Sequence, residues 1–138
     1  MRTAYLLSMV CAPVFNIVVT AWMRGAVSRF LHQTRCIETR TQLVRYEFLA
    51  TRAMLGKLVQ LLSTVAAAVV FGLGVTRGLL LPGHVLLLVV PGTAHLVMYL
   101  GYRRIEKRAK SLELDNLTLL DEFNRVQDTW RNKTLPIW

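Results

Sequence analysis

The stretch LVQLLSTVAAAVVFGLGVTRGLLLPGHVLLLVVPGTAHLVMYLGY, residues 58–102, decides the fold class. Its one Lys, Arg, Asp or Glu residue is Arg77, and the turn-forming residues Gly78, Pro82 and Gly83 follow directly. The apolar runs on either side are each long enough to cross a hydrocarbon core about 30 Å thick as a helix. The stretch therefore predicts a transmembrane helical hairpin, with one helix over residues 58–76 and the next over residues 82–102.

Another apolar run, over residues 3–23, carries no charge. Only Arg2 precedes it, so the Arg-rich pattern of a transit peptide is absent, and the run is longer than an ordinary signal-peptide core. We expect a retained signal-anchor helix. The predicted fold class is an all-α integral membrane protein with three transmembrane helices, divided into segments 1–23, 24–57, 58–102 and 103–138.

The composition agrees with a membrane protein, because 54% of the residues are hydrophobic while the net charge is +9. The basic residues lie beside the apolar runs, and no nucleic-acid-binding motif is visible, so we expect no nucleic-acid partner. They gather between the first two runs and after the third. The positive-inside rule places these segments on the cytoplasmic side, or on the matrix side in a mitochondrion.

The basic segment 24–57 carries one narrow helical stripe of apolar residues, formed by Phe30, Ile37, Val44, Phe48 and Leu55. The segment is either one interfacial helix lying along the headgroups or a helical hairpin that breaks near residues 36–41. The sequence TRTQ at residues 39–42 matches a capping box and favours the hairpin. We expect anionic phospholipid such as cardiolipin to be bound by Arg29, Arg40, Arg45, Arg52, Lys57, Arg103 and Arg104.

The C-terminal segment has the alternating steps of four and three that mark the core of a coiled coil. The positions are Ile105, Ala109, Leu112, Asn116, Leu119, Phe123, Val126 and Trp130. We predict one amphipathic heptad helix that ends at Pro136. Its apolar face either docks onto another protein or folds back on the chain's own stripe over residues 30–55. The predicted partner-binding residues are Ile105, Leu112, Asn116, Leu119, Phe123, Val126 and Trp130.

His84 and His95 are the candidate cofactor ligands, because on one helix they share a face about 16 Å apart. The residues GTAHL at 92–96, followed by Leu100 and Gly101, resemble the haem-histidine segment of the cytochrome b-type membrane anchor of succinate dehydrogenase. The sequence departs from that family at Ala94, where the family has an arginine. The resemblance implies a haem b or quinone role, and the alternative is a His95 that hydrogen-bonds a neighbouring helix.

No nucleophile with a positioned base is visible, so we expect a protein that is not an enzyme and has no cofactor. We expect an accessory subunit of a large mitochondrial inner-membrane complex, in the respiratory chain or ATP synthase, with the other subunits as partners. One alternative is the haem- or quinone-associated anchor. Another is a membrane-protein insertase or assembly factor, since three spans with a helical hairpin after the first resemble the YidC-like insertases.

Overall fold

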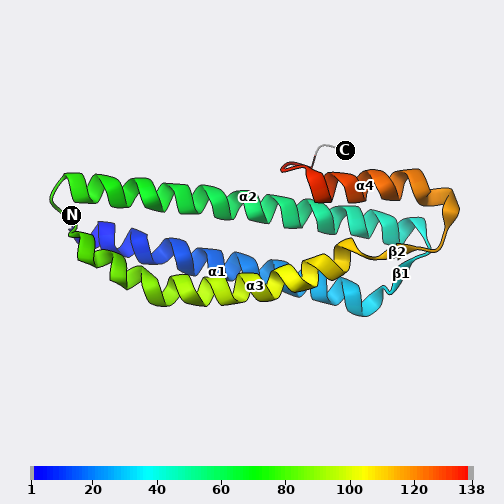
Figure 1. Ribbon diagram of the computed structural model, residues 1–138, viewed down its shortest axis with the longest axis horizontal. Helices are drawn as coiled ribbons and strands as arrows, with labels where there is room; N and C mark the ends of the chain where they lie inside the picture. The colour runs from blue at the N-terminus through cyan, green and yellow to red at the C-terminus, as the bar shows by residue number, and fades with distance from the viewer. Residues whose placement is uncertain (1, 137–138) are drawn as a thin grey trace.

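The computed structural model describes residues 2–136; Met1 and positions 137 and 138 of the predicted C-terminal segment lie outside that range. Its elements are α1 (Arg2–Gln33), β1 (Cys36–Ile37), α2 (Arg40–Thr76), η1 (Pro82–Leu88), α3 (Val89–Lys110), β2 (Glu113–Leu114), η2 (Leu117–Leu119) and α4 (Leu120–Asn132). Figure 1 shows an elongated all-α bundle in which α1 packs against both α2 and α3, and α4 lies along one end of α2.

Two helices, α1 and α2, are long and apolar enough to cross a membrane. Their 32 and 37 residues give lengths of about 48 and 55 Å, well above a hydrocarbon core of about 30 Å. Each helix therefore continues without a break from its apolar run into the basic segment. Large apolar side chains face outward along the apolar run of α2, such as Leu62 at 59% exposure, which is typical of a surface that contacts lipid.

The predicted third span over residues 82–102 is not one regular α-helix, because its first seven residues form the 3₁₀ helix η1. Pro91 explains the change of helix type. In a continuous α-helix its nitrogen would have to bond the carbonyl of Leu87, and proline has no N–H. Pro91 instead lies in the first turn of α3, where a missing N–H breaks no intrahelical hydrogen bond.

The basic segment forms the hairpin and not the single interfacial helix. Thr39 caps α2: its hydroxyl accepts a bond from the Gln42 N–H at 3.3 Å, and its own N–H donates to Gln42 Oε1 at 3.1 Å. These reciprocal bonds make the predicted capping box and place the start of α2. The two arms of the hairpin are the C-terminal end of α1 and the N-terminal end of α2.

The predicted apolar stripe is divided between two faces. Phe30 and Ile37 are buried, whereas Val44, Phe48 and Leu55 are exposed. The stripe assumed one continuous helix, and the break before Thr39 changes the phase of α2 relative to α1. The buried face of this part of α2 is instead formed by Leu43, Tyr46, Leu49, Ala50, Ala53 and Met54.

The predicted heptad helix is two helices, α3 and α4, joined by an extended connection. In that connection β2 pairs in parallel with β1, with Cys36 opposite Glu113 and Ile37 opposite Leu114. Asn116, expected to fix a coiled-coil register, accepts a bond from the Thr118 N–H at 3.0 Å and so caps η2. The chain then reverses, and α4 runs back along α2 (Figure 1).

α1 and α2 pack closely at Gly56, because a Cβ there would overlap the sulfur of the buried Met23. We expect Gly56→Leu to lower the free energy of unfolding by about 1–3 kcal/mol through overpacking. Gly72 on the same helix has open space around it, so Gly72→Leu should leave stability unchanged or raise it by up to about 1 kcal/mol. Denaturant unfolding in mild detergent, followed by circular dichroism, measures both. Equal effects of the two substitutions would contradict the close approach.

Candidate functional site

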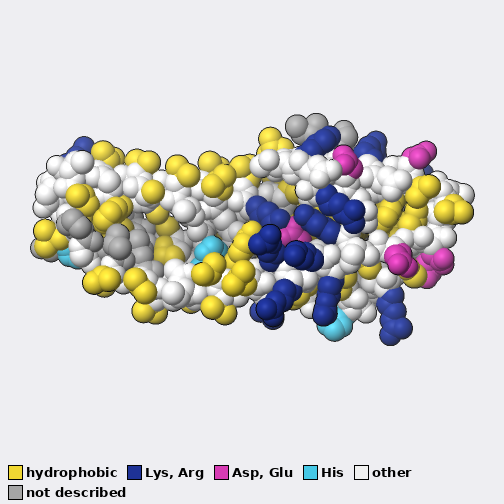
Figure 2. Space-filling model, viewed as in Figure 1, with side chains coloured by type: hydrophobic (Ala, Val, Ile, Leu, Met, Phe, Trp, Pro, Cys, Tyr) yellow, Lys and Arg dark blue, Asp and Glu magenta, His cyan; other side chains and the backbone are white. Residues whose placement is uncertain are grey.

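The molecule has two unlike halves. We call residues 3–23, 58–76 and 82–102 the apolar half, and residues 24–57 and 103–136 the polar half. Figure 2 shows hydrophobic side chains over one end and Lys and Arg side chains gathered beside them toward the other. All the predicted headgroup-binding residues belong to the polar half: Arg29, Arg40, Arg45, Arg52, Lys57, Arg103 and Arg104. Arg40 lies at the far end of the hairpin, 3.7 Å from Glu122, whereas Lys57 and Arg103 lie at the boundary between the halves.

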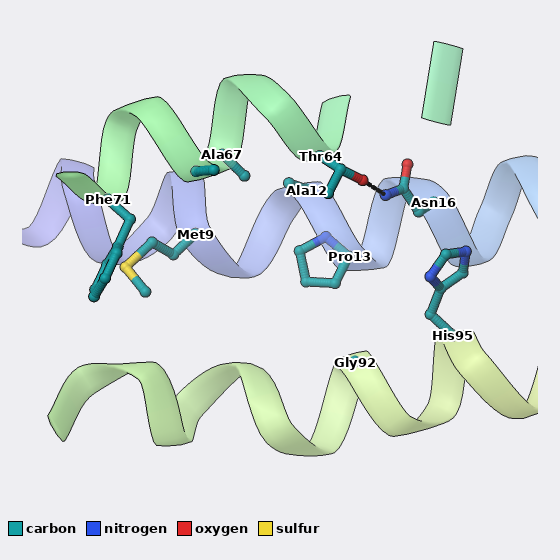
Figure 3. A pocket seen from close by; sticks show the side chains of 10 residues that line it. Met9, Ala12, Pro13, Asn16, Thr64, Ala67, Phe71, Gly92 and His95 are labelled. Atoms are coloured by element: carbon teal, nitrogen blue, oxygen red, sulfur yellow. Dashed lines mark hydrogen bonds between the residues drawn. The ribbon is translucent and has the colours of Figure 1, made fainter. Parts of the chain in front are cut away.

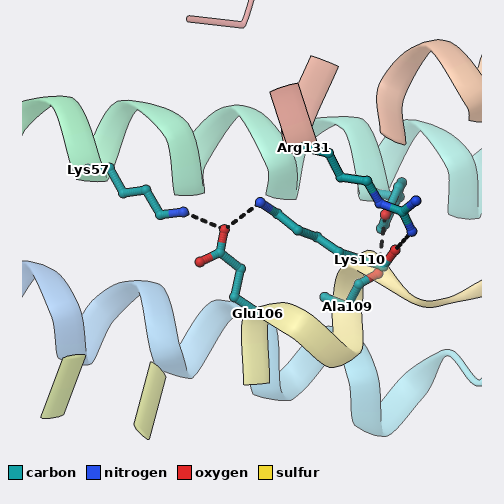
Figure 4. A network of polar contacts seen from close by, with 6 residues as sticks. Lys57, Glu106, Ala109, Lys110 and Arg131 are labelled. Atoms are coloured by element: carbon teal, nitrogen blue, oxygen red, sulfur yellow. Dashed lines mark hydrogen bonds and ion pairs between the residues drawn. The ribbon is translucent and has the colours of Figure 1, made fainter. Parts of the chain in front are cut away.

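A cavity of about 480 Å³ opens at this boundary, lined by Lys57, Tyr99, Arg103, Glu106, Lys107 and Lys110. The Glu106 side chain is 5% exposed, and one of its oxygens lies 2.5 Å from Lys57 Nζ and 3.2 Å from Lys110 Nζ (Figure 4). Burial lowers the pKa of Lys110, while the neighbouring carboxylate opposes that change. Four basic side chains and one carboxylate therefore line the cavity, an arrangement suited to an anionic headgroup.

Arg52 is held by aromatic rings. Its guanidinium lies 5.0 Å from the ring centroid of Trp22 on α1 and 4.5 Å from that of Phe48 on α2. A cation over aromatic faces stabilises by about 0.5–1 kcal/mol at exposed sites. Arg52 therefore joins α1 to α2 just beyond the boundary, a role that its place in the basic segment did not indicate.

The predicted partner-binding residues lie against the chain's own core. Phe123, Val126 and Trp130 are buried on α2, and Ile105, Leu112 and Leu119 pack partly buried against the same cluster. The amide of Asn116 donates to the carbonyl of Glu38 at 3.2 Å. The arrangement is the fold-back alternative, in which these residues join the chain's own helices.

The two candidate histidines do not lie on one regular helix. His84 belongs to η1, where its Nδ1 accepts a hydrogen bond from the Leu81 N–H at 2.8 Å, and His95 belongs to α3. The stacked-haem geometry predicted for one α-helix is therefore not formed. His95 lies beside Tyr99, with ring centroids 6.3 Å apart, and lines a cavity shared with α1 and α2.

An exposed apolar surface runs along the outside of α2, and the sequence predicted only part of it. We call it the outer stripe, formed by Val44, Phe48, Leu55, Val59, Leu62, Val69 and Leu73, each at least 41% exposed. Steps of three, four and seven residues keep these side chains on one side of the helix. Val44, Phe48 and Leu55 belong to the predicted stripe of the basic segment. The other four positions follow when the pattern is started at the capped end of α2 and continued past residue 57.

The geometry defines a class of protein: a small all-α chain whose apolar half is able to cross a membrane and whose polar half is closed by an aromatic core. No protein-family model, curated protein or solved structure matches this chain. The outer stripe, the boundary cavity and the cavity beside His95 are the surfaces from which its function is argued.

The boundary ion pairs give a stability prediction. Glu106→Gln leaves the ammonium groups of Lys57 and Lys110 facing each other without a counter-charge, so we expect the free energy of unfolding to fall by about 2–3 kcal/mol. Adding Lys110→Met removes the repulsion and should recover part of the loss.

Glu122→Gln is the matched control, because its exposed pair with Arg40 at 3.7 Å should contribute less than about 1 kcal/mol. Chemical unfolding at neutral pH in detergent compares the three variants with the unaltered chain. A Glu106 variant as stable as the Glu122 variant would show that the buried pairs do not hold the helices together.

Proposed function

We propose that this chain is a non-catalytic accessory subunit of a large membrane complex. The single observation that carries the proposal is the outer stripe of α2, which continues from the apolar half into the polar half. Lipid covers such a stripe only as far as the bilayer extends. The part of the stripe beyond the bilayer is covered only if another protein packs against it.

Distances along α2 support the need for a protein partner. Taking Lys57 as the boundary, Phe48 and Val44 lie about 14 and 20 Å farther along the helix axis, at 1.5 Å per residue. The headgroup layer extends only about 5–7 Å beyond the hydrocarbon on each side. Both side chains, 58% and 57% exposed, therefore stand in water unless a protein surface covers them.

The occupant we propose is a helix of another subunit that runs beside α2 from the bilayer into the aqueous phase. Its apolar residues would recur at helical spacing to match the stripe. The exposed Arg45, next to Val44, favours an acidic residue on that helix. A partner of this kind fits a permanent subunit better than an enzyme, because the contact is long, apolar and far from any reactive group.

The proposal includes three transmembrane segments. The third is η1 with the apolar part of α3, which together extend about 35 Å, enough to cross a hydrocarbon core. The basic boundary favours a polar half that faces the matrix, by the positive-inside rule. Cardiolipin is the headgroup we propose for the boundary cavity. The mitochondrial inner membrane, with the respiratory chain or ATP synthase as the complex, is proposed by analogy with small basic subunits of those assemblies.

The outer stripe is tested by Val44→Asp combined with Phe48→Asp. Two carboxylates in an apolar contact would lose their hydration when the partner helix docks, so we expect the subunits that co-purify with the tagged chain to fall at least about tenfold. The matched control, Val44→Leu with Phe48→Leu, should retain them. Quantitative mass spectrometry after mild detergent extraction gives the ratio. Full retention by the Asp variant, with helicity and membrane association unchanged, would overturn the proposal.

Orientation is tested at Cys36, which lies at the tip of the hairpin in the polar half. In a Cys11→Ser background, a membrane-impermeant maleimide should label Cys36 in mitoplasts only after detergent is added. The Glu38 hydrogen bond raises the pKa of the Cys36 thiol, so the reaction is run at mildly alkaline pH. Labelling of intact mitoplasts, or absence of the chain from the inner-membrane fraction, would contradict the matrix orientation.

A further inference from the structure

A second cavity, of about 360 Å³, lies inside the apolar half between α1, α2 and α3. It forms because α1 packs against both neighbours, whereas the described parts of α2 and α3 have little direct contact with each other. Figure 3 shows Met9 and Phe71 at one end, and Asn16 and His95 at the other. The cavity is therefore apolar along its length and polar at one end.

Hydrogen bonds fix the orientation of the Asn16 amide at that polar end. The Asn16 Nδ2 group donates to Thr64 Oγ1 at 3.2 Å. Thr64 has one hydroxyl proton, which it donates to the carbonyl of Gln60 at 2.8 Å, so toward Asn16 it can only accept. The Asn16 oxygen Oδ1 is consequently left as an acceptor.

Two buried polar atoms at this end have no hydrogen-bond partner among the described residues: Oδ1 of Asn16 and Nε2 of His95. Asn16 is 4% exposed, so bulk solvent does not satisfy it. An unsatisfied buried polar atom costs about 1–3 kcal/mol. Both residues line one cavity, so the two unsatisfied groups indicate a ligand with a polar group at this end.

The remaining walls restrict the chemistry of that ligand. None of the ten lining residues is Asp, Glu, Lys or Arg, so a charged head would be buried without a counter-charge. The apolar walls suit a ring or an alkyl chain. The volume lies in the range of about 300–1,000 Å³ that is usual for small-molecule sites.

We propose that this cavity binds an uncharged, hydroxyl-bearing amphiphile from the bilayer. In the proposed complex the hydroxyl donates to Asn16 Oδ1 and accepts from Nε2 of a neutral His95 that carries its proton there, whereas a carbonyl only accepts. The apolar body of the ligand extends along the wall toward Met9 and Phe71. A sterol, a diacylglycerol and a membrane quinol share this chemistry. The site stands independently of the proposed subunit contact, since it uses a different face of α2.

The ligand class is tested with the full chain in non-ionic detergent. The probes are cholesterol, dioctanoylglycerol and decylhydroquinone, with the methyl ethers of cholesterol and decylhydroquinone as controls that lack the hydroxyl. We expect saturable binding of at least one hydroxyl probe, measured by equilibrium dialysis and by thermal stabilisation, and at least about tenfold weaker binding of an ether, equivalent to about 1.4 kcal/mol. The probe that binds identifies the source of the hydroxyl.

The site is tested with Gly92→Leu and His95→Leu, each expected to weaken binding at least about tenfold. Gly92 lines the cavity and has open space around it, so a leucine there fills the cavity without disturbing the packing. The control Gly72→Leu, also in open space but outside the cavity, should bind as the unaltered chain does. Absence of saturable binding by every hydroxyl probe, equal binding by the ethers, or unchanged binding by Gly92→Leu would each overturn the proposal.

Discussion

Tyr46 is the residue on which the arrangement of the helices depends. Its ring on α2 lies 6.0 Å from Phe30 of α1, and 5.7 and 5.3 Å from Phe123 and Trp130 of α4. Its hydroxyl donates to the carbonyl of Ala109 at 3.1 Å, near the end of α3. Burial raises the pKa of Tyr46, so the phenol keeps the proton that it donates. One side chain thus joins all four helices, and leaving that hydroxyl unpaired in the core would cost about 1–3 kcal/mol.

This join matters because helices in lipid have no hydrophobic drive to associate, since lipid tails are as apolar as their side chains. In the apolar half, α1 and α2 are held by polar bonds close to the boundary: Gln60 Nε2 donates to Thr20 Oγ1 at 2.6 Å and to the Asn16 carbonyl at 3.1 Å. On the side of Gln60 that points away from the polar half, no hydrogen bond among the described side chains joins α3 to α2. The cavity beside His95 therefore opens on the far side of these bonds, where the spacing of α2 and α3 depends on their separate packing against α1.

Local signals in the sequence predicted the elements that local physics determines. The capping box at Thr39 and Gln42 placed the turn of the hairpin, because both bonds form within four residues. The long apolar runs predicted the two helices that are able to cross a membrane. The heptad pattern wrongly predicted one helix, because α3 and α4 present apolar residues to the same core and the spacing continues across their connection. Residues 111–119 also contain no Gly or Pro that would mark the break. The juxtaposition of Asn16 with His95 depends on how two distant helices are rotated, which periodicity within either helix does not determine.

In the proposed membrane arrangement the boundary charges connect the two halves, because they fix how deep the helices lie in the bilayer. The ammonium group of Lys57 is paired with Glu106 across to α3, and Arg103 lines the same cavity. Moving these groups into hydrocarbon would cost several kcal/mol for each charge, so α2 and α3 stop at the same depth. In this arrangement Val44 and Phe48 would lie beyond the headgroups, while Leu62 and Leu73 belong to the apolar half. In the proposed arrangement one continuous stripe is thereby divided into a part that lipid covers and a part left for protein. For that reason we propose the outer face of α2, and not the inward-facing α4, as the surface for a partner.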